Sequence, residues 1–450
     1  MHLSQLLTVV VSLVAAAPPE QVHLALTEDE GSMRVSWATM VENDAGGAVT
    51  FGVRGEEDSD SVAGSSYAYS GDNFTGTLHS AVLGGLRDGA RYEYVVSSAS
   101  GERSETFNFT FVGRAPAISF LSYGDMGVVN SAGTIAVADA LAATGNYDLL
   151  LNVGDTSYAN DVGPRGNNSW VFDEHFRNIQ AHASAMPFMS VPGNHEEQYD
   201  FKPYKNRLPM PRMPKASKDL APFYYSFDLG PAHFLAYSSE VEHPLHKGSE
   251  QRAFIERDLA AANENRRARP WIVAFTHHPM YCSDLLTERT RCQKEAYKYR
   301  EDLEQLFLEN KLDLHISGHN HQYERSWGVY GCDEEGTKKC QISEETHNSP
   351  YPVYIVNGAG GDVEGIDPTW VPEALAPFRA FHGSGLRTGL ATVDMNLTHL
   401  VWRFHYTGSG AWPHAHKFHW HNDSVGAAGL SSLATIDELV LTRDDPALPP

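Results

Sequence analysis

The sequence predicts two domains, an all-β sandwich followed by an α/β domain. Its 450 residues exceed what a single hydrophobic core usually spans. Residues 18–113 contain short runs of alternating apolar and polar residues, whereas strongly apolar runs alternate with helical patterns beyond that point. The composition changes at Gly113-Arg114-Ala115-Pro116. We therefore expect one domain over 18–113 and a second over 114–450.

The first 17 residues are predicted to be a secretory signal peptide. An apolar run from Leu6 to Ala17 is too short to span a membrane and ends in three alanines. An apolar first strand is the alternative, because only the terminal amine and His2 could supply the basic start of such a signal. No other segment is long and apolar enough to cross a bilayer, so no membrane span is expected.

Short strands are expected throughout 18–113. Alternating runs lie at 22–26, 33–37, 92–96 and 107–111, separated by clusters of Gly, Asp and Ser. About seven strands of this kind predict a sandwich. Nothing in this stretch groups histidines or acids in a catalytic pattern, so its expected role is structural or in docking.

Strands and helices alternate in 114–450. Candidate strands are 118–122, 149–153, 188–191, 271–275, 312–317 and 353–357, and helical patterns cover 134–143, 251–266 and 294–310. Residues 390–395 and 399–404 predict a final hairpin. This order is typical of an α/β or layered β/α domain.

The composition excludes several partners. With 42% hydrophobic and 20% charged residues the chain is globular, and its net charge of -23 argues against nucleic acid or an anionic membrane. An anionic substrate would therefore have to be attracted by local cations or metals.

In a secreted protein, the sequons and the cysteines of this chain can both be interpreted. Five N-x-[ST] sequons become plausible glycan sites, at Asn73, Asn108, Asn167, Asn396 and Asn422. The four cysteines form two close pairs, and local pairing, Cys282 with Cys292 and Cys332 with Cys340, is the most economical of three connectivities.

Polar residues follow five of the central strands in the second domain. The motifs are GDMG (124–127), GDTSY (154–158), GNHE (193–196), THHP (276–279) and GHNH (318–321). In open α/β sheets, ligands bind at the carboxyl ends of the strands. Each motif alone has an ordinary interpretation, such as an Asx turn at Asp125 or Asp155, or a core histidine at His277. Five of them in one chain predict a metal site.

The residue types indicate two metals. Carboxylates, a phenolate and an amide oxygen are hard ligands, whereas imidazoles suit Zn, Fe or Mn. A carboxylate between two half-sites can bridge ions about 3.5–4 Å apart, the spacing used for phosphoryl displacement. Neither a G-x-x-x-x-G-K-[ST] loop nor a G-x-S-x-G elbow occurs in the sequence.

These ordered motifs resemble those of the metallophosphoesterases, and specifically the purple acid phosphatases. Tyr158, three residues after Asp155, narrows the resemblance, because the family's G-D-x-x-Y supplies a tyrosinate to ferric iron. The resemblance covers nearly the whole chain. It implies a fibronectin-III-like N-terminal sandwich, as in the large members, followed by a metallophosphoesterase domain. The stretch Trp420-His421-Asn422-Asp423 is similar to one near their C-termini.

The resemblance also implies a ligand set. Fe(III) would be held by Asp125, Tyr158 and His321, and a divalent Zn, Fe or Mn by Asn194, His277 and His319, with Asp155 bridging. A metal-bound hydroxide would be the nucleophile. His195 would contact the phosphate or protonate the leaving alkoxide.

The residue that protonates the leaving group has more than one candidate. His278 follows the expected ligand His277, where other members have serine or tyrosine. It is the alternative to His195, followed by Glu196 or water. The loop 282–292 contains no histidine, unlike that of plant members, and is similar to the cysteine-containing loop of animal-type members.

Two other clusters are less informative. The run His414, His416, His419 and His421 is expected to be a strand with solvent-facing histidines rather than a metal site. The basic stretch 202–207 is either a wall of the substrate entrance or a solvated loop.

The sequence thus predicts a secreted purple acid phosphatase that hydrolyses small phosphate monoesters, extracellular or in the lumen of a secretory compartment. A phosphodiesterase, phytase or nucleotide pyrophosphatase on the same centre is the alternative, and a non-catalytic surface glycoprotein is a remote one. A homodimer is possible.

Overall fold

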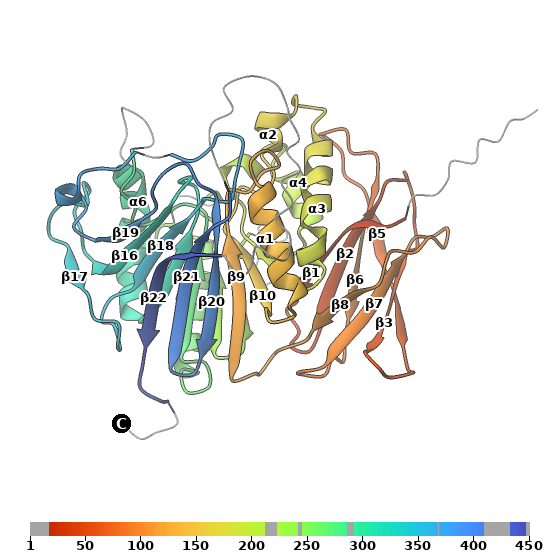
Figure 1. Cartoon of the computed structure of the whole chain (residues 1–450), viewed down its shortest axis with the longest axis horizontal. Coiled ribbons are helices and arrows are strands. Elements are labelled where there is room, and N and C mark those ends of the chain that lie inside the picture. Colours follow the sequence, from red (N-terminus) through yellow and green to blue (C-terminus); the bar gives the residue numbers. More distant parts are fainter. Residues whose placement is uncertain are drawn as a thin grey trace, which may run out of the picture.

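The computed structural model describes residues 18–211, 223–241, 245–285, 292–367, 369–408 and 433–446. It has an N-terminal β-sandwich, drawn in red to orange in Figure 1, beside a larger domain of sheets and helices that runs from the light orange of β9 to blue. The predicted two-domain fold is confirmed.

The N-terminal domain consists of two antiparallel four-stranded sheets, one more strand than the sequence suggested. Their orders are β1-β2-β6-β5 and β4-β3-β7-β8. Trp37, Tyr94 and Phe109 are buried in this domain. The strands are β1 Glu20–Leu26, β2 Met33–Thr39, β3 Ala48–Val53, β4 Asp60–Ala63, β5 Ser65–Tyr67, β6 Thr77–Leu83, β7 Arg91–Ser97 and β8 Phe107–Thr110.

The second domain contains two sheets that pack face to face. One has the order β11-β10-β9-β20-β21-β22; the other runs β12-β13-β14-β15-β18-β16-β17, with β19 paired to β16. Phe120 of β9 contacts Phe234 of β13 edge-on, and Tyr323 of β16 stacks on Phe404 of β21. The strands are β9 Ala117–Tyr123, β10 Leu149–Asn152, β11 Phe188–Ser190, β12 Tyr225–Leu229, β13 Ala232–Ala236, β14 Trp271–Phe275, β15 Leu314–Ser317, β16 Tyr323–Tyr330, β17 Gln341–Ser343, β18 Val353–Asn357, β19 Arg379–His382, β20 Gly389–Asn396, β21 His399–Tyr406 and β22 Thr435–Thr442.

The parallel strands bring the motif ends together. β9, β10 and β11 are parallel in the first sheet, and β13, β14, β15 and β18 in the second. The runs LLLN of β10 and WIVAF of β14 are buried at every position, as expected for strands covered on both faces. Their carboxyl ends therefore meet at one edge of the sandwiched sheets.

Helices cover the outer faces of both sheets. α1 packs against β20 and α3, α3 packs against β1 of the sandwich, and α5 packs against β13. The Ser249 side chain accepts a hydrogen bond from Arg252 N and so caps α5. The helices are α1 Ala132–Ala143, α2 Ala159–Val162, α3 Ser169–Ala183, α4 Lys202–Arg207, α5 Glu250–Glu264 and α6 Cys292–Glu309, with short 3₁₀ turns η1 Asn194–Glu196 and η2 Glu373–Leu375.

Arg207 joins the two domains, which corrects the interpretation of 202–207 as a substrate wall or a solvated loop. The stretch forms α4, and the Arg207 side chain is buried. Its guanidinium donates to Asp173 of α3 (2.8 Å), and to Gln21 (2.9 Å) and Tyr69 (3.0 Å) of the sandwich. A buried arginine needs such partners, so this residue serves the domain interface.

The local cysteine pairing is confirmed, with Cys282 bonded to Cys292 and Cys332 to Cys340. Four of the five sequon asparagines lie in the described residues, and all four are exposed: Asn73, Asn108, Asn167 and Asn396. The expected signal peptide, the histidine run 414–421 and Asn422 lie outside the described residues. Within them, no helix has the length and apolar character needed to cross a membrane.

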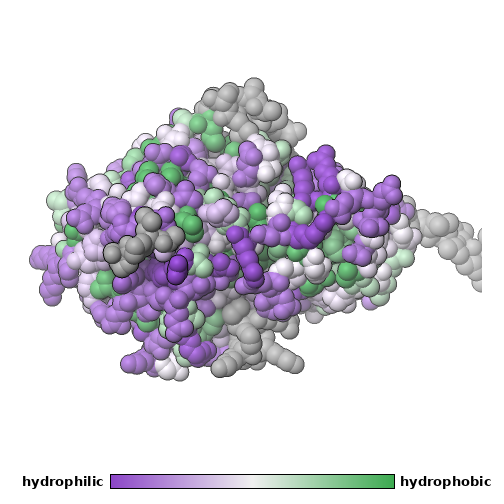
Figure 2. All heavy atoms as spheres, turned by 90° about the horizontal axis from the view of Figure 1, so that it is seen from below, coloured by the Kyte–Doolittle hydropathy of each residue, from purple (hydrophilic) through white to green (hydrophobic). Residues whose placement is uncertain are grey.

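The face in Figure 2 is covered largely by hydrophilic residues, with hydrophobic ones scattered among them. Among the described residues, only Val82, Trp170 and Leu386 are large hydrophobic side chains that are exposed. Such a surface suits a highly charged chain.

Candidate metal centre

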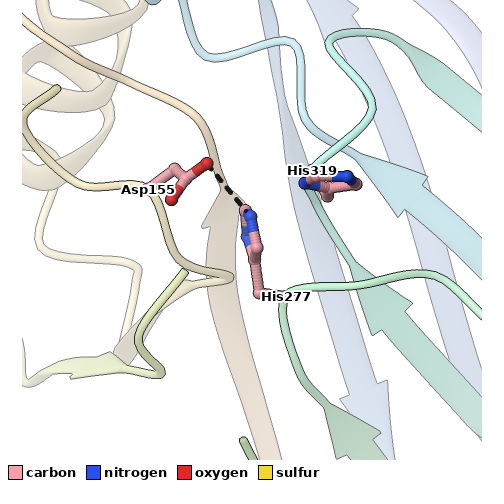
Figure 3. Close-up of side chains that lie close together, drawn as sticks. All are labelled: Asp155, His277 and His319. Atoms are coloured by element: carbon pink, nitrogen blue, oxygen red, sulfur yellow. Dashed lines mark ion pairs between the residues drawn. The ribbon is translucent and has the colours of Figure 1, made fainter. Parts of the chain in front are cut away.

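All seven predicted ligand residues lie together at the carboxyl ends of the strands. Asp125 follows β9, Asp155 and Tyr158 follow β10, and Asn194 follows β11. His277 follows β14, and His319 and His321 follow β15. Figure 3 shows Asp155, His277 and His319 converging from three separate loops, and their ligand atoms lie within 4.8 Å of one another.

Their donor atoms form two groups. In the first, the Tyr158 hydroxyl lies 2.8 Å from His321 Nε2 and 3.2 Å from Asp125 Oδ1. In the second, Asn194 Oδ1 lies 3.0 Å from His277 Nε2 and 2.9 Å from His319 Nδ1. Asp155 Oδ2 touches both groups, at 3.4 Å from the Tyr158 hydroxyl and 3.0 Å from His277 Nε2.

The backbone at these loops is held in an unusual conformation. Asp125, Asp155, Tyr158 and His319 all have positive φ, between 48° and 67°. Non-glycine residues in this region cost on the order of 1 kcal/mol or more and cluster at functional sites. A Cβ at Gly193 or Gly318 would collide with the carboxylate of Asp155 or Asp125, so glycine is needed beside each ligand loop.

The histidines present lone pairs to the centre of the site. His277 Nδ1 donates to the Val153 carbonyl (2.9 Å) and His321 Nδ1 to the Gly365 carbonyl (3.2 Å). These bonds fix the tautomer and leave each Nε2 facing inward, the usual arrangement of a metal-bound histidine. A cluster of nitrogen and oxygen donors that converge in this way fits a bound cation.

The pKa values point to the same requirement for positive charge. Burial raises the pKa of Asp125 and of Tyr158 well above their usual values, and neighbouring carboxylates raise them further. Burial by itself would lower the pKa of His277, but the carboxylate of Asp155 raises it to about 10. Burial would raise the pKa of Asp155, but His277 lowers it. Highly charged cations would stabilise the ionised forms and displace these protons, so the donor set fits a dinuclear centre.

His195 and His278 flank the centre from opposite sides. His195 lies over the Tyr158 ring (4.1 Å between centroids), and its Nδ1 is 2.9 Å from Asp161 Oδ2 and 3.0 Å from Asn160 Oδ1. Although burial lowers the pKa of His195, Asp161 raises it to about 9. The His278 ring lies 3.7 Å from the His319 ring between centroids and is tilted against it by 36°, and its Nε2 is 3.4 Å from Glu240 Oε1.

Glu196, the third candidate for proton transfer, is tied to the backbone. Its two oxygens accept hydrogen bonds from Thr156 N and Gly193 N, both at 2.9 Å, and the side chain is buried. This geometry fastens the second and third motif loops to each other, which suits a structural role better than proton transfer.

No site residue was predicted from the sequence at a sixth strand end, the one after β18. β18 is followed by Gly358-Ala359-Gly360-Gly361-Asp362, and a Cβ at Gly358 would collide with Asp125. The buried Asp362 places Oδ1 3.4 Å from His321 Nδ1, and Glu364 lies beside His195 and His321. The strand 353–357 had been predicted, so the glycine-rich turn and acid after it were the available signal. Glu240 had a similar signal, because it follows the buried strand β13 by four residues, whereas Asp161 had none.

Two facing sheets with carboxylate, amide and imidazole donors at the strand ends define a metallophosphoesterase. Three family models match the chain: the purple acid phosphatase N-terminal domain (19–111), the calcineurin-like phosphoesterase (118–323) and the iron/zinc purple acid phosphatase-like protein C (351–411).

Relatives from animals and plants support the same family assignment. Acid phosphatase type 7 of Homo sapiens is 36% identical over 377 residues, which cover 78% of this chain and 80% of that protein. The probable purple acid phosphatase 20 of Arabidopsis thaliana is 31% identical, covering 86% and 84%. The Fe(3+)-Zn(2+) purple acid phosphatase 12 of Arabidopsis is 27% identical, covering 87% and 82%.

A solved purple acid phosphatase from yellow lupin (Lupinus luteus) seeds shares the fold. It matches with a TM-score of 0.74 at 20% identity, covering 96% of this chain and 76% of that one. The chain belongs to the purple acid phosphatase family, and the resemblance seen in the motifs is confirmed.

Proposed function

We propose that this protein is a secreted acid phosphatase that hydrolyses phosphate monoesters at a centre of Fe(III) and a divalent Zn, Fe or Mn. The observation that carries the proposal is the convergence of seven donor residues in two groups that share Asp155. The name of the Fe(3+)-Zn(2+) Arabidopsis relative supports the metal pair.

Asp125, Tyr158 and His321 would hold the ferric ion, and Asn194, His277 and His319 the divalent ion. Asp155 would join both, because its Oδ2 touches each group. When bound, the two cations supply charge that polarises the phosphoryl group and activates water. The Val153 and Gly365 carbonyls hold His277 and His321 in position for this task.

His195 is proposed to contact the substrate phosphate or to protonate the leaving alkoxide. Asp161 and Asn160 hold its Nδ1, which leaves Nε2 turned to the inside of the site, 3.9 Å from Asp155 Oδ2. Asp161 stabilises the protonated ring, the form that can donate a proton. His278 is the alternative, on the divalent side, with Glu240 in the corresponding position.

The proposal of secretion and glycosylation is supported by the signal-like N-terminus, two disulfides and four exposed sequons. Small phosphorylated molecules are the proposed substrates, and the net charge of -23 disfavours nucleic acid. A homodimer stays a prediction.

A substrate panel tests the activity. The full chain would be assayed with p-nitrophenyl phosphate, bis-p-nitrophenyl phosphate, ATP and phytate, before and after chelation. We expect the monoester to react fastest, with loss of activity on chelation and recovery on adding iron and zinc. A rate equal to the blank in the metal-loaded protein would contradict the proposal, and a preference for the diester would replace the substrate class.

The secreted form is tested by the protein recovered from the culture medium of expressing eukaryotic cells. We expect a mature chain that begins near Pro18 and loses mass on treatment with an N-glycosidase. Recovery of an unprocessed chain from inside the cells alone would contradict secretion.

A further inference from the structure

Residues 282–285, which follow β14 and begin the disulfide loop, lie directly behind the GHNH turn. Cys282, Ser283 and Asp284 are fully buried, and Cys282 is bonded to Cys292 at the start of α6. This loop replaces the histidine-containing loop that the resemblance to plant members would imply. Its two polar residues make contacts that the proposed chemistry does not use.

Asp284 holds the residue between the two histidines. Asn320 Nδ2 donates to both carboxylate oxygens of Asp284, at 2.9 and 2.8 Å, and both side chains are buried. Asn320 stands between His319 and His321, so fixing its side chain fixes the backbone that carries both rings. This backbone is tightly turned, because Asn320 N donates to Gly318 O and Gln322 N to Asn320 O.

Ser283 makes a second contact four residues further along the turn. Its backbone N donates to Glu324 Oε2 (2.7 Å), and its hydroxyl donates to Glu324 Oε1. Arg379 Nη1 donates to the same hydroxyl at 2.8 Å. Glu324 lies near the start of β16. Asp284 and Ser283 therefore contact the chain on both sides of His321, at Asn320 and at Glu324.

A buried carboxylate at position 284 is expected to lower the stability of the fold, so packing alone does not explain it. Within the described ranges, Asn320 is the side chain that donates hydrogen bonds to Asp284, and no lysine or arginine there forms an ion pair with it. An isolated buried carboxylate is disfavoured, and apolar residues would pack this position more cheaply. A role in orienting the turn accounts for that cost.

We propose that Ser283 and Asp284 form a brace that positions His319 and His321 for metal binding, with Asp284 as a positioning residue. This inference rests on the proposed function. The brace keeps His319 Nδ1 turned to Asn194 and His321 Nε2 turned to Tyr158, although His319 has a strained φ of 67°. Outer contacts of this kind typically change metal affinity or activity by about 10–100-fold.

A reciprocal exchange tests the brace. D284N places two amides face to face and N320D two carboxylates, whereas the double variant D284N/N320D restores a carboxylate facing an amide. The readouts are the rate of metal loss to a chelator and the visible absorption band of the loaded protein. We expect each single variant to lose metal about 10–100-fold faster, and the double variant to recover most of that loss.

D148N is the matched control. Asp148 Oδ2 accepts a hydrogen bond from Ser119 N at 2.9 Å, at the opposite ends of β9 and β10. D148N should lower the thermal midpoint without changing metal release, which separates a positioning role from general destabilisation. If D284N does not fold, S283A decides the question. It removes the hydroxyl contacts with Glu324 Oε1 and Arg379 Nη1, keeps the hydrogen bond from the backbone N of residue 283 to Glu324, and should speed metal loss by a smaller factor.

The outcomes separate the two proposals. Wild-type rates of metal loss in folded D284N or S283A, or a double variant no better than its singles, would overturn the brace. The proposed function would stand in that case, provided that the wild-type protein holds metal and hydrolyses p-nitrophenyl phosphate. A wild-type protein that binds no metal would overturn the proposed function itself.

Discussion

At the scale of single residues, Asp155 is the side chain on which the site depends most. Its Oδ2 faces both donor groups, and its Oδ1 accepts a hydrogen bond from His195 N at 2.8 Å. D155A should therefore lose both metals and lower kcat/KM by roughly 10³-fold or more, since several kcal/mol of charge stabilisation disappear. Metal content by mass spectrometry and initial rates check this. Retention of one metal at full stoichiometry would show that Asp155 is not shared.

His195 should affect turnover and not metal binding. H195A is expected to keep both metals and to lower kcat by about 10²–10⁴-fold, the usual range for a lost proton donor. D161N should show a smaller loss, because it only removes the charge that holds His195 Nδ1. H347A, at an exposed histidine, is the control. If H195A loses metal, His195 is a ligand, and if H278A alone loses turnover, His278 is the proton donor.

The residue scale also shows why the sequence predicted part of the site. Asp125, Asp155, Asn194 and His277 each follow an apolar run directly, so a linear pattern locates them. Asp284 lies in a loop without such a pattern, and only the tertiary fold places it against Asn320 of the GHNH turn. The positive φ angles at Asp155 and Tyr158 also depend on packing, and no local propensity predicts them.

At the scale of elements, the pairing of β12 and β13 with α5 makes stability depend on pH. His233 lies between Asp228 Oδ1 (2.7 Å) and Asp258 Oδ2 (2.8 Å). Burial would lower the pKa of His233, but these carboxylates raise it from 6.5 to about 9. The stabilisation is thus complete below about pH 6.5 and is lost as pH rises through 9, a difference of about 3 kcal/mol.

Urea unfolding at about pH 6 and pH 9.5 checks this dependence. The wild-type free energy of unfolding should fall between the two, whereas H233Q should show a much flatter profile and lower stability at pH 6. H347Q is the control at an exposed histidine. An identical slope in H233Q and wild-type protein would rule out His233 as the source.

Strands that coincide with strongly apolar runs were predictable, and short strands without such a run were not. β9, β10, β14 and β18 match the apolar runs closely, because burial on both faces requires continuous hydrophobicity. β4, β5, β17 and β19 have three or four residues each, and they form only by pairing with longer neighbours. α4 was also missed, since its basic composition suggested a solvated surface.

At the scale of the whole molecule, a buried polar network ties the sandwich to the catalytic domain. Arg207 bonds to Asp173 in its own domain and to Gln21 in the other. R207A should lower the free energy of unfolding by about 3–5 kcal/mol, because it leaves the buried Asp173 without its cation. R403A breaks the partly exposed pairs with Asp394 and Glu438 and should cost at most about 1 kcal/mol. Equal losses in these two variants would argue against the network.

A cavity of about 620 Å³ lies between the two domains, away from the proposed chemistry. It is lined in part by Leu26, Phe111, Phe227 and His233. The catalytic proposal therefore rests on the donor atoms at the strand ends and not on the size of a pocket. The net charge of -23 also favours a metal site, because only local cations could attract a phosphate to so acidic a molecule.

The central claim is that two metals are held by seven residues, with Tyr158 bound to iron. The most direct test is metal stoichiometry together with the visible absorption spectrum of wild-type protein and Y158F. We expect one iron and one divalent metal per wild-type chain and a tyrosinate-to-iron band that disappears in Y158F, which should stay folded. A metal-free wild-type protein, or an iron-containing one whose band is unchanged in Y158F, would contradict the account.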